Sequence, residues 1–353
     1  MSSGSALARL FFETEVRPLV DSALPSLGYV GARLGSGSDV LGFDDERSRD
    51  HDFGCRLTLL VDEGSSEVVP HIDELLEQQL PNEFEGYATR FPTTWDGRCR
   101  HKVEISTVHA FAKSRLGLDP ATELDTVGWL CLTGQSILEV VGGPVFHDTT
   151  QSFGPLQQRL AWYPDDVWRY VLAAAWTRLG QELPFVGRTG ERADDLGSSV
   201  IAARLARDLI HLSFLVNRTW SPYPKWAVTA LAGLPNGPEL IGSLLAVTGA
   251  TDWRAREAAL CEAIAIVGAE HLEAGFELDA PFVEPFFDRP YLIPGPKTVE
   301  SIRFGIVDPE LRSLPPGIGS VEQWCDNVDV LSHPARRREV ERIYRQLMAG
   351  TDR

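Results

Sequence analysis

Asp50 and Asp52 stand one residue apart, directly before the apolar segment FGCRLTLLV. Side chains at positions i and i+2 of a strand leave the same face, so the two carboxylates would project together while His51 pointed away. Mg²⁺ binds a few carboxylate oxygens and completes its octahedron with water and substrate phosphates. The spacing therefore predicts a site for one or two Mg²⁺ ions at Asp50 and Asp52.

A third acid, Glu104, lies between Val103 and Ile105 in the β-like segment HKVEISTVHAF. An acid in such a run costs stability unless it is paired or binds a metal. Three acids on two strands can hold two ions, which stabilise the attacking and leaving oxygens at a phosphorus atom. We therefore predict Glu104 as a metal ligand or as a base toward an acceptor. The alternative is a solvent-facing residue on an edge strand.

A Gly-Ser pair, Gly37 and Ser38, precedes these acids in the segment RLGSGSDVLGFDDERSRDHD. Glycine allows close backbone approach, and serine offers a hydroxyl and an amide to phosphate oxygens. We predict that this pair binds the phosphates of a nucleotide. The other acids of the run are expected to form a solvated or turn-forming loop, since Asp favours local backbone hydrogen bonds. They are Asp39, Asp44, Asp45 and Glu46.

The composition narrows the class of partner. The chain has 353 residues and a formal net charge of −17. Such a surface repels phosphate backbones, which argues against nucleic acids and anionic membranes, whereas a nucleotide that brings magnesium is not excluded. Five scattered cysteines suggest neither disulfides nor a zinc site, and no leader-like or membrane-spanning run is present. We expect a cytoplasmic protein, and the oligomeric state stays open.

Apolar periodicity places these residues on secondary structure. Helical spacing marks residues 5–20 and PHIDELLEQQL. Strand patterns mark YVGA, FGCRLTLLV, HKVEISTVHAF and the stretch after the Gly-Gly pair in SILEVVGGPVFHD. From about residue 155 the apolar period is mostly helical. The segment GQELPFVGRTGERADDLGS is expected to be a polar loop between two helices. Residues 280–334 are expected to be a Pro-rich stretch of irregular chain and short helices, before a final charged helix.

Together, the Gly-Ser pair, Asp50-His51-Asp52 and the distant Glu104 resemble the DNA polymerase beta-like nucleotidyltransferase superfamily. The wider sequence, including the segments SPYPKW and GSVEQWCDN, is similar to a bacterial family within that superfamily. The family is known only as a domain of unknown function. One departure is His51, where an apolar residue is usual. The broad motif covers about the first third of the chain and the narrower similarity nearly all of it.

The resemblance implies an α+β fold, as in aminoglycoside and lincosamide nucleotidyltransferases. A nucleotidyltransferase-like domain over residues 1–154 would hold a mixed sheet flanked by helices. A mostly helical C-terminal domain would span residues 155–353. In SPYPKW, Tyr223 and Lys225 could receive a base and a phosphate, although such residues also pack domain surfaces.

The expected function is Mg²⁺-dependent transfer of a nucleoside monophosphate, AMP from ATP, to a hydroxyl of a small molecule, with release of pyrophosphate. Positioning and charge neutralisation would supply most of the catalysis. Two alternatives stay open. The acceptor could be a protein hydroxyl, or the fold could bind a ligand without transfer or serve other chemistry.

Overall fold

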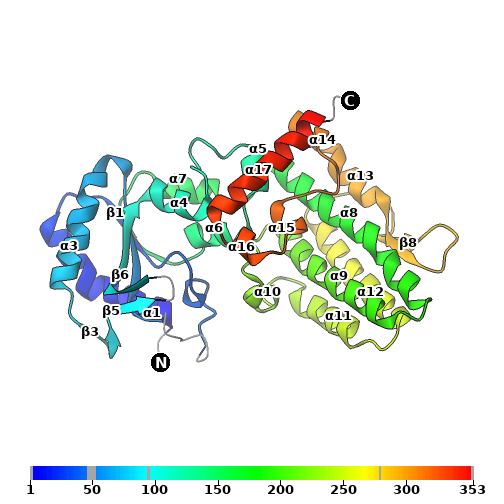
Figure 1. The fold of residues 1–353 in the computed structure, drawn as a ribbon, viewed down its shortest axis with the longest axis horizontal. Coiled ribbons are helices and arrows are strands. Elements are labelled where there is room, and N and C mark those ends of the chain that lie inside the picture. Colours follow the sequence, from blue (N-terminus) through cyan, green and yellow to red (C-terminus); the bar gives the residue numbers. More distant parts are fainter. Residues whose placement is uncertain (1–2, 46–52, 94–95, 278–279, 351–353) are drawn as a thin grey trace. The chain divides into compact units, whose positions relative to one another are not determined.

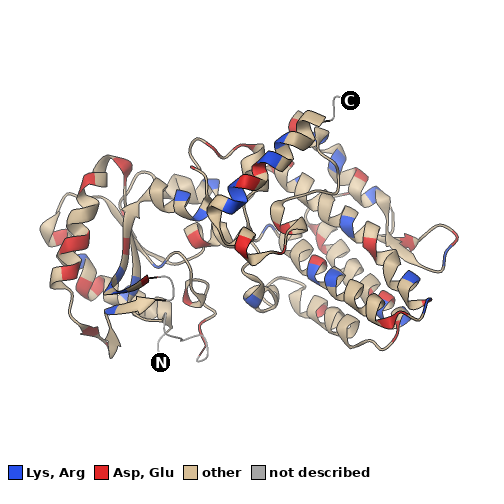
Figure 2. Ribbon diagram, in the orientation of Figure 1, with Lys and Arg blue, Asp and Glu red and all other residues tan. Residues whose placement is uncertain are grey.

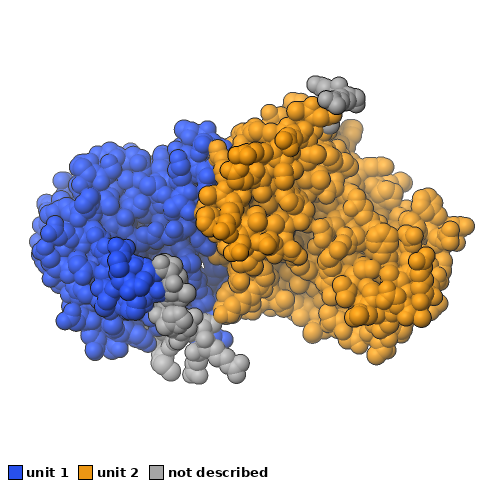
Figure 3. Space-filling model, in the orientation of Figure 1, with its two compact units in different colours: residues 1–124, 136–161 blue, residues 125–135, 162–353 orange. Residues whose placement is uncertain are grey.

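The structure of the protein is a computed structural model, and it describes residues 3–45, 53–93, 96–277 and 280–350. The chain divides into two compact units (Figure 3). Unit 1 comprises residues 1–124 and 136–161, and unit 2 comprises residues 125–135 and 162–353. The predicted boundary at 154/155 falls inside unit 1.

Unit 1 is built on a mixed five-stranded sheet of order β5-β6-β2-β1-β7 (Figure 1). β2 and β6 are parallel, and the other pairs are antiparallel. The strands are β1 (Tyr29–Ala32), β2 (Arg56–Val61), β5 (Arg90–Thr93), β6 (Asp96–Thr107) and β7 (Val145–Asp148). The four predicted strands are confirmed, except that the last four residues of HKVEISTVHAF, Val108 to Phe111, lie in a helix, α4 (Val108–Leu116). A small hairpin of β3 (Glu83–Phe84) and β4 (Tyr87–Ala88) is additional.

An apolar core joins the sheet to the first helical segment. That segment consists of α1 (Gly4–Phe11), the π-helix η1 (Phe12–Val16) and α2 (Arg17–Ala23). Phe12 is fully buried, and its ring lies where a side chain on Gly31 of β1 would be, since a Cβ there would meet it at 2.3 Å. Glycine in β1 is therefore what lets the helix pack this closely on the sheet.

The remaining helices of unit 1 lie between or after the strands. They are η2 (Ser38–Val40), η3 (Glu63–Val68), α3 (Val69–Gln79), α4 (Val108–Leu116) and α7 (Phe153–Arg159), while α6 (Gly134–Val141) begins in the segment assigned to unit 2. Thr107 caps α4 by accepting a hydrogen bond from the Ala110 N–H, which ends β6 and starts the helix in one step.

Unit 2 is mostly helical, and the α+β fold class is confirmed. Its main helices are α8 (Asp165–Gly190), α9 (Asp195–Val216), α10 (Pro224–Leu231), α11 (Gly237–Gly249) and α12 (Trp253–Glu273). The prediction of a polar loop from GQELPFVGRTGERADDLGS is wrong, because α8 continues through Pro184 to Gly190. Leu183 and Val186 are buried in this last part of α8, and their packing offsets the helix bond lost at the proline.

The C-terminal part of unit 2 combines short elements. They are β8 (Val283–Pro285), β9 (Leu292–Pro294), α13 (Pro296–Phe304), α14 (Pro309–Ser313), α15 (Val321–Trp324) and α16 (Val328–Leu331), followed by the charged helix α17 (Pro334–Ala349); α5 (Thr126–Leu130) also belongs to this unit. No helix within the described ranges combines the length and apolar character needed to cross a membrane.

Candidate functional site

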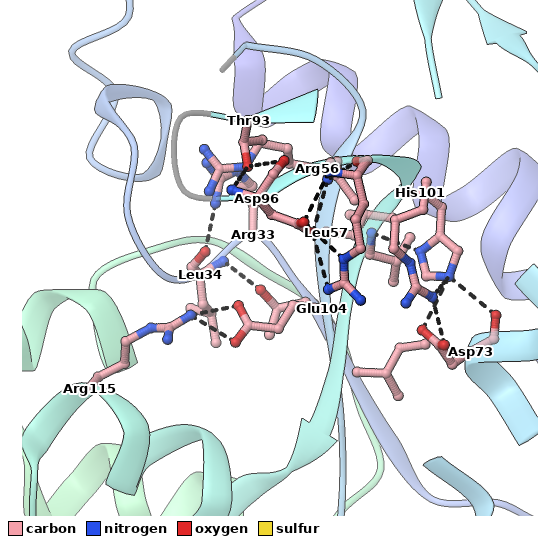
Figure 4. Close-up of a pocket in the computed structure, with 16 residues that line it drawn as sticks. Arg33, Leu34, Arg56, Leu57, Asp73, Thr93, Asp96, His101, Glu104 and Arg115 are labelled. Carbon is pink, nitrogen blue, oxygen red and sulfur yellow. Dashed lines mark hydrogen bonds and ion pairs between the residues drawn. The ribbon is translucent and has the colours of Figure 1, made fainter. Parts of the chain in front are cut away.

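A pocket of about 380 Å³ opens on one face of the unit 1 sheet, over β2 and β6 (Figure 4). We call it the strand-face pocket. Its charged lining residues come from five parts of the unit: the end of β1, β2, α3, β6 and α4. They are Arg33, Arg56, Asp73, Asp96, Arg98, Arg100, Lys102, Glu104 and Arg115. Six of these nine carry a positive charge, in a chain whose net charge is −17.

The positive residues of β6 follow strand alternation. Arg98, Arg100 and Lys102 are spaced two apart, so they share a face. His101 and Val103, on the other face, are buried. The parallel register places Arg56 of β2 opposite Lys102. Basic residues of β5 and β6 are visible in Figure 2.

Acids around the rim hold the cations in place. Arg100 contacts Asp73 of α3 at 2.6 Å. Asp96 contacts both Arg98, at 2.9 Å, and Lys102, at 3.5 Å. The hydrogen bonds from Arg98 hold the pKa of the Asp96 carboxyl well below its usual range. Six cations and three acids line the pocket, and Asp39 and Glu139 contact Arg33 and Arg115 from beside it. A small excess of positive charge therefore remains to attract an anion.

Glu104 lies in this pocket, next to Lys102 on β6 and opposite Thr58 of β2. As predicted, Val103 packs in the core on the other face, and Ile105 packs against that core. Both Glu104 carboxylate oxygens accept hydrogen bonds from Arg115 Nη2, at 2.8 and 2.6 Å. Arg115 also lies 3.7 Å from Glu139. The register between β5 and β6 ends at His101, so at Glu104 the described β6 pairs with β2 alone, and the Glu104 side chain is 43% exposed, as the alternative of a solvent-facing residue expected.

Gly37 and Ser38 form a tight turn near the pocket. Gly37 has φ +138°, which L side chains rarely adopt, and it directly precedes η2. A Cβ on Gly37 would lie 2.3 Å from Asp39 Oδ1, 2.5 Å from Arg33 Nη2 and 3.4 Å from Arg56 Nη1. The turn thus brings backbone close to two arginines that line the pocket.

Arg33 fixes this turn from inside. Its Nε and Nη2 donate to the two oxygens of Asp39, at 2.7 and 2.8 Å. It also donates to the carbonyls of Leu34 and Ser36, at 2.6 and 3.0 Å. The Arg33 side chain is 2% exposed, and that of Asp39 11%. Asp39 is therefore not solvated. Of the two alternatives, the turn-forming one agrees with the structure, since the buried Arg33 pairs with Asp39 and fixes the turn.

The predicted metal pair, Asp50 and Asp52, lies outside the described residues, as does Glu46. Within the described ranges, no group of three or more His, Cys, Asp or Glu side chains is arranged to hold a metal ion. Of the three predicted ligands, Glu104 is the one that the structure describes, and its role as a metal ligand stays a prediction.

Tyr223 and Lys225 belong to unit 2, at the start of α10. The Tyr223 N–H donates to Gln135 Oε1 at 2.9 Å, and its ring lines a second pocket. The Lys225 ammonium lies 4.8 Å from the centroid of the Trp226 ring, a cation–π distance. Lys225 does not line the pocket that Tyr223 lines, and the role of the two residues in nucleotide binding stays a prediction.

The chain is similar to one protein family and to a solved structure. Residues 129–227 match the model of a family described as "Domain of unknown function (DUF4037)". This confirms the expected similarity to a family known only as a domain of unknown function. A nucleotidyltransferase-like protein from Exiguobacterium sibiricum 255-15 is similar in structure at 13% identity and a TM-score of 0.34, covering 77% of this chain and 78% of that chain. None of the curated proteins matches the chain.

Proposed function

We propose that the strand-face pocket of unit 1 binds a nucleoside triphosphate, ATP, and that the protein transfers AMP from it to a hydroxyl of a small molecule. The observation that carries this proposal is the excess of arginine and lysine in one pocket of a strongly acidic chain. A triphosphate carries several negative charges on compact groups, and arginine binds such oxygens with two parallel N–H donors.

The Gly37-Ser38 turn supports the same proposal. The absence of a side chain on Gly37 lets its backbone lie close to Asp39, Arg33 and Arg56, since a Cβ there would clash with the first two. Arg33 and Asp39 hold the turn with buried hydrogen bonds, so little conformational freedom is lost when a phosphate binds. A preorganised site of this kind suits phosphoryl chemistry, in which positioning and charge neutralisation dominate.

In the proposed reaction, the hydroxyl oxygen forms a bond to the α-phosphorus while the bond to pyrophosphate breaks, and the hydroxyl proton is released. Mg²⁺ is part of the proposal, with Asp50, Asp52 and Glu104 as its ligands. Bound Mg²⁺ would neutralise charge on the phosphate oxygens. Glu104 has suitable oxygens, but Arg115 now holds both, so Arg115 would have to release them. Glu139, at 3.7 Å, offers Arg115 a second partner.

The test is turnover of ATP labelled at the α-phosphate, with a panel of hydroxyl-bearing small molecules and Mg²⁺. Wild-type protein should release pyrophosphate and move the label to an acceptor. Asp50→Asn and Asp52→Asn should each abolish turnover, while Asp45→Asn, from the same run of acids, should retain it. Retained turnover in both Asp50→Asn and Asp52→Asn would refute the proposed roles of these residues.

A further inference from the structure

A second cavity, of about 390 Å³, lies entirely within unit 2. It is bounded by α9, by the turn before α10 and by the short helices α15 and α16, and we call it the α15 cavity. Its volume falls in the range of small-molecule sites. Neither the strand-face pocket nor the proposed transfer reaction uses it.

Glu322, in the first turn of α15, is the polar group at the inner side of this cavity. Its Oε2 accepts a hydrogen bond from the Gly134 N–H at 3.2 Å. It also lines a small adjoining void of about 20 Å³, together with Trp162 and Trp220. A carboxylate can accept about four hydrogen bonds, so Glu322 has capacity for a further donor.

The charged groups around Glu322 favour a cationic donor. Among the described residues that line the cavity, Arg207 is the one basic side chain, and it already contacts Asp326 at 3.3 Å. His211 lies one helical turn further along α9 and lines both the cavity and the void. Burial lowers the His211 pKa to about 4, so this ring is neutral at pH 7. Within the described lining of the cavity, two carboxyl groups thus face one arginine, which is already paired. A second arginine, Arg337, acts on Glu322 from outside the lining and is 2% exposed.

The rest of the lining is suited to an apolar body. Pro222, Tyr223 and Pro224 form one side, and Val328 and Leu331 of α16 form another. Tyr223 is 42% exposed, so much of its ring remains free to cover a ligand. Apolar walls with a few converging polar groups are the usual composition of a small-molecule site.

We propose that the α15 cavity binds a primary amine with an apolar or aromatic body, its ammonium group paired with the Glu322 carboxylate. The ammonium would donate to Glu322 beside the Gly134 N–H, and the body would lie against the proline, tyrosine and leucine side chains. An inorganic or phosphate anion is disfavoured, because it would meet two carboxyl groups and an arginine that is already paired. This site is independent of the proposed nucleotidyl transfer.

Protonation of Glu322 gives the binding a pH dependence. Burial raises the pKa of this carboxyl to about 7, although Gly134, Arg337 and Arg207 act in the other direction. The other titratable groups that face it are His211, already neutral, and Tyr163, whose pKa burial raises well above 10. Because an ammonium binds the ionised form, affinity should fall as the pH drops below about 7, by up to about tenfold per pH unit.

The experiment uses the full chain and a fluorescent primary amine, dansylcadaverine, with its N-acetyl derivative as the uncharged counterpart. At pH 8 the amine should bind at least about tenfold more tightly than the acetylated compound, since a hydrogen bond between two charged groups is stronger than one between neutral groups. Glu322→Gln should remove that preference. Glu239→Gln, an exposed acid in the first turn of α11, is the matched control and should retain it.

A second variant tests the location without touching the charge. Leu331→Trp would fill part of the α15 cavity and should weaken the binding of both compounds, while the far-ultraviolet circular dichroism stays that of wild type. Equal affinity for the two compounds, absence of binding at pH 8, or a preference that survives Glu322→Gln would each overturn the proposal. General attraction of the amine to the acidic surface of the protein would also overturn the proposal. In that case Glu322→Gln and Glu239→Gln would reduce the preference for the amine equally.

Discussion

Replacing Arg33 by methionine removes the guanidinium group that holds the Gly37-Ser38 turn. The substitution keeps a long, flexible side chain but leaves Asp39 buried without its partner, as well as the carbonyls of Leu34 and Ser36 without their donor. Removing one partner of a buried ion pair destabilises a protein by about 3–5 kcal/mol, because a charge is left uncompensated.

The size of this effect follows from burial. The Arg33 and Asp39 side chains are 2% and 11% exposed. By contrast, Arg9 and Glu13 of the same unit form an i,i+4 pair at 3.7 Å, with side chains about half exposed. Exposed pairs contribute about 0–1 kcal/mol. The same substitution at Arg9 is therefore the control for loss of a guanidinium group at the surface.

Guanidinium chloride denaturation, followed by circular dichroism, measures the free energy of unfolding. Arg33→Met should lower it by about 3–5 kcal/mol, and Arg9→Met by at most about 1 kcal/mol. The double variant Arg33→Met/Asp39→Leu should recover much of the loss, because it removes both charges. A loss below about 1 kcal/mol in Arg33→Met, or no recovery in the double variant, would refute the role of the pair.

Three further outcomes are expected. Gly37→Ala should lower the free energy of unfolding by about 1–3 kcal/mol or more, because φ is positive there and the new Cβ would clash with Asp39. Denaturation should show a smaller loss for the control Gly42→Ala, since no atom lies within 4 Å of a Cβ at that position. Lys102→Gln should raise the calorimetric dissociation constant of a non-hydrolysable ATP analogue about tenfold, while Lys297→Gln, exposed in unit 2, leaves it unchanged; equal effects would contradict the pocket. The third outcome concerns His271. Burial lowers its pKa from 6.5 to about 4, and its ring nitrogens have no hydrogen-bond partner among the described residues. Between about pH 6.5 and 4 the unfolded state therefore binds more protons than the folded state, so His271 should lower the free energy of unfolding by about 3 kcal/mol as the pH falls through this range. His271→Phe should flatten the measured dependence of the free energy of unfolding on pH, and an unchanged dependence would contradict this.

Much of the unit 1 sheet was predictable from local sequence. Alternation in FGCRLTLLV and HKVEIST, and the Gly-Gly turn before β7, identified strands that the structure confirms. The same alternation in RCRHKVE also places Arg98, Arg100 and Lys102 on one face of the strand, which is a local signal for a basic pocket. Periodicity therefore contained the main feature of the strand-face pocket.

Contacts between distant residues explain what local sequence could not predict. Asp39 looked like part of a polar run, but the sequence does not show that Arg33 turns inward to meet it. The segment GQELPFVGRTGERADDLGS was expected to be a polar loop, yet α8 continues through Pro184 because residues around it are buried in unit 2. Glu104 accepts hydrogen bonds from Arg115, eleven positions later on α4, and local sequence does not show that contact. In each case, tertiary packing decided the outcome over local preference.

The most direct test of the central claim is a crystal structure of the protein with Mg²⁺ and a non-hydrolysable ATP analogue. Our account predicts triphosphate density against Arg56, Arg100 and Lys102, beside the Gly37 turn, with Asp50 and Asp52 on the metal. Triphosphate density elsewhere, or an empty strand-face pocket at a saturating concentration of the analogue, would contradict it.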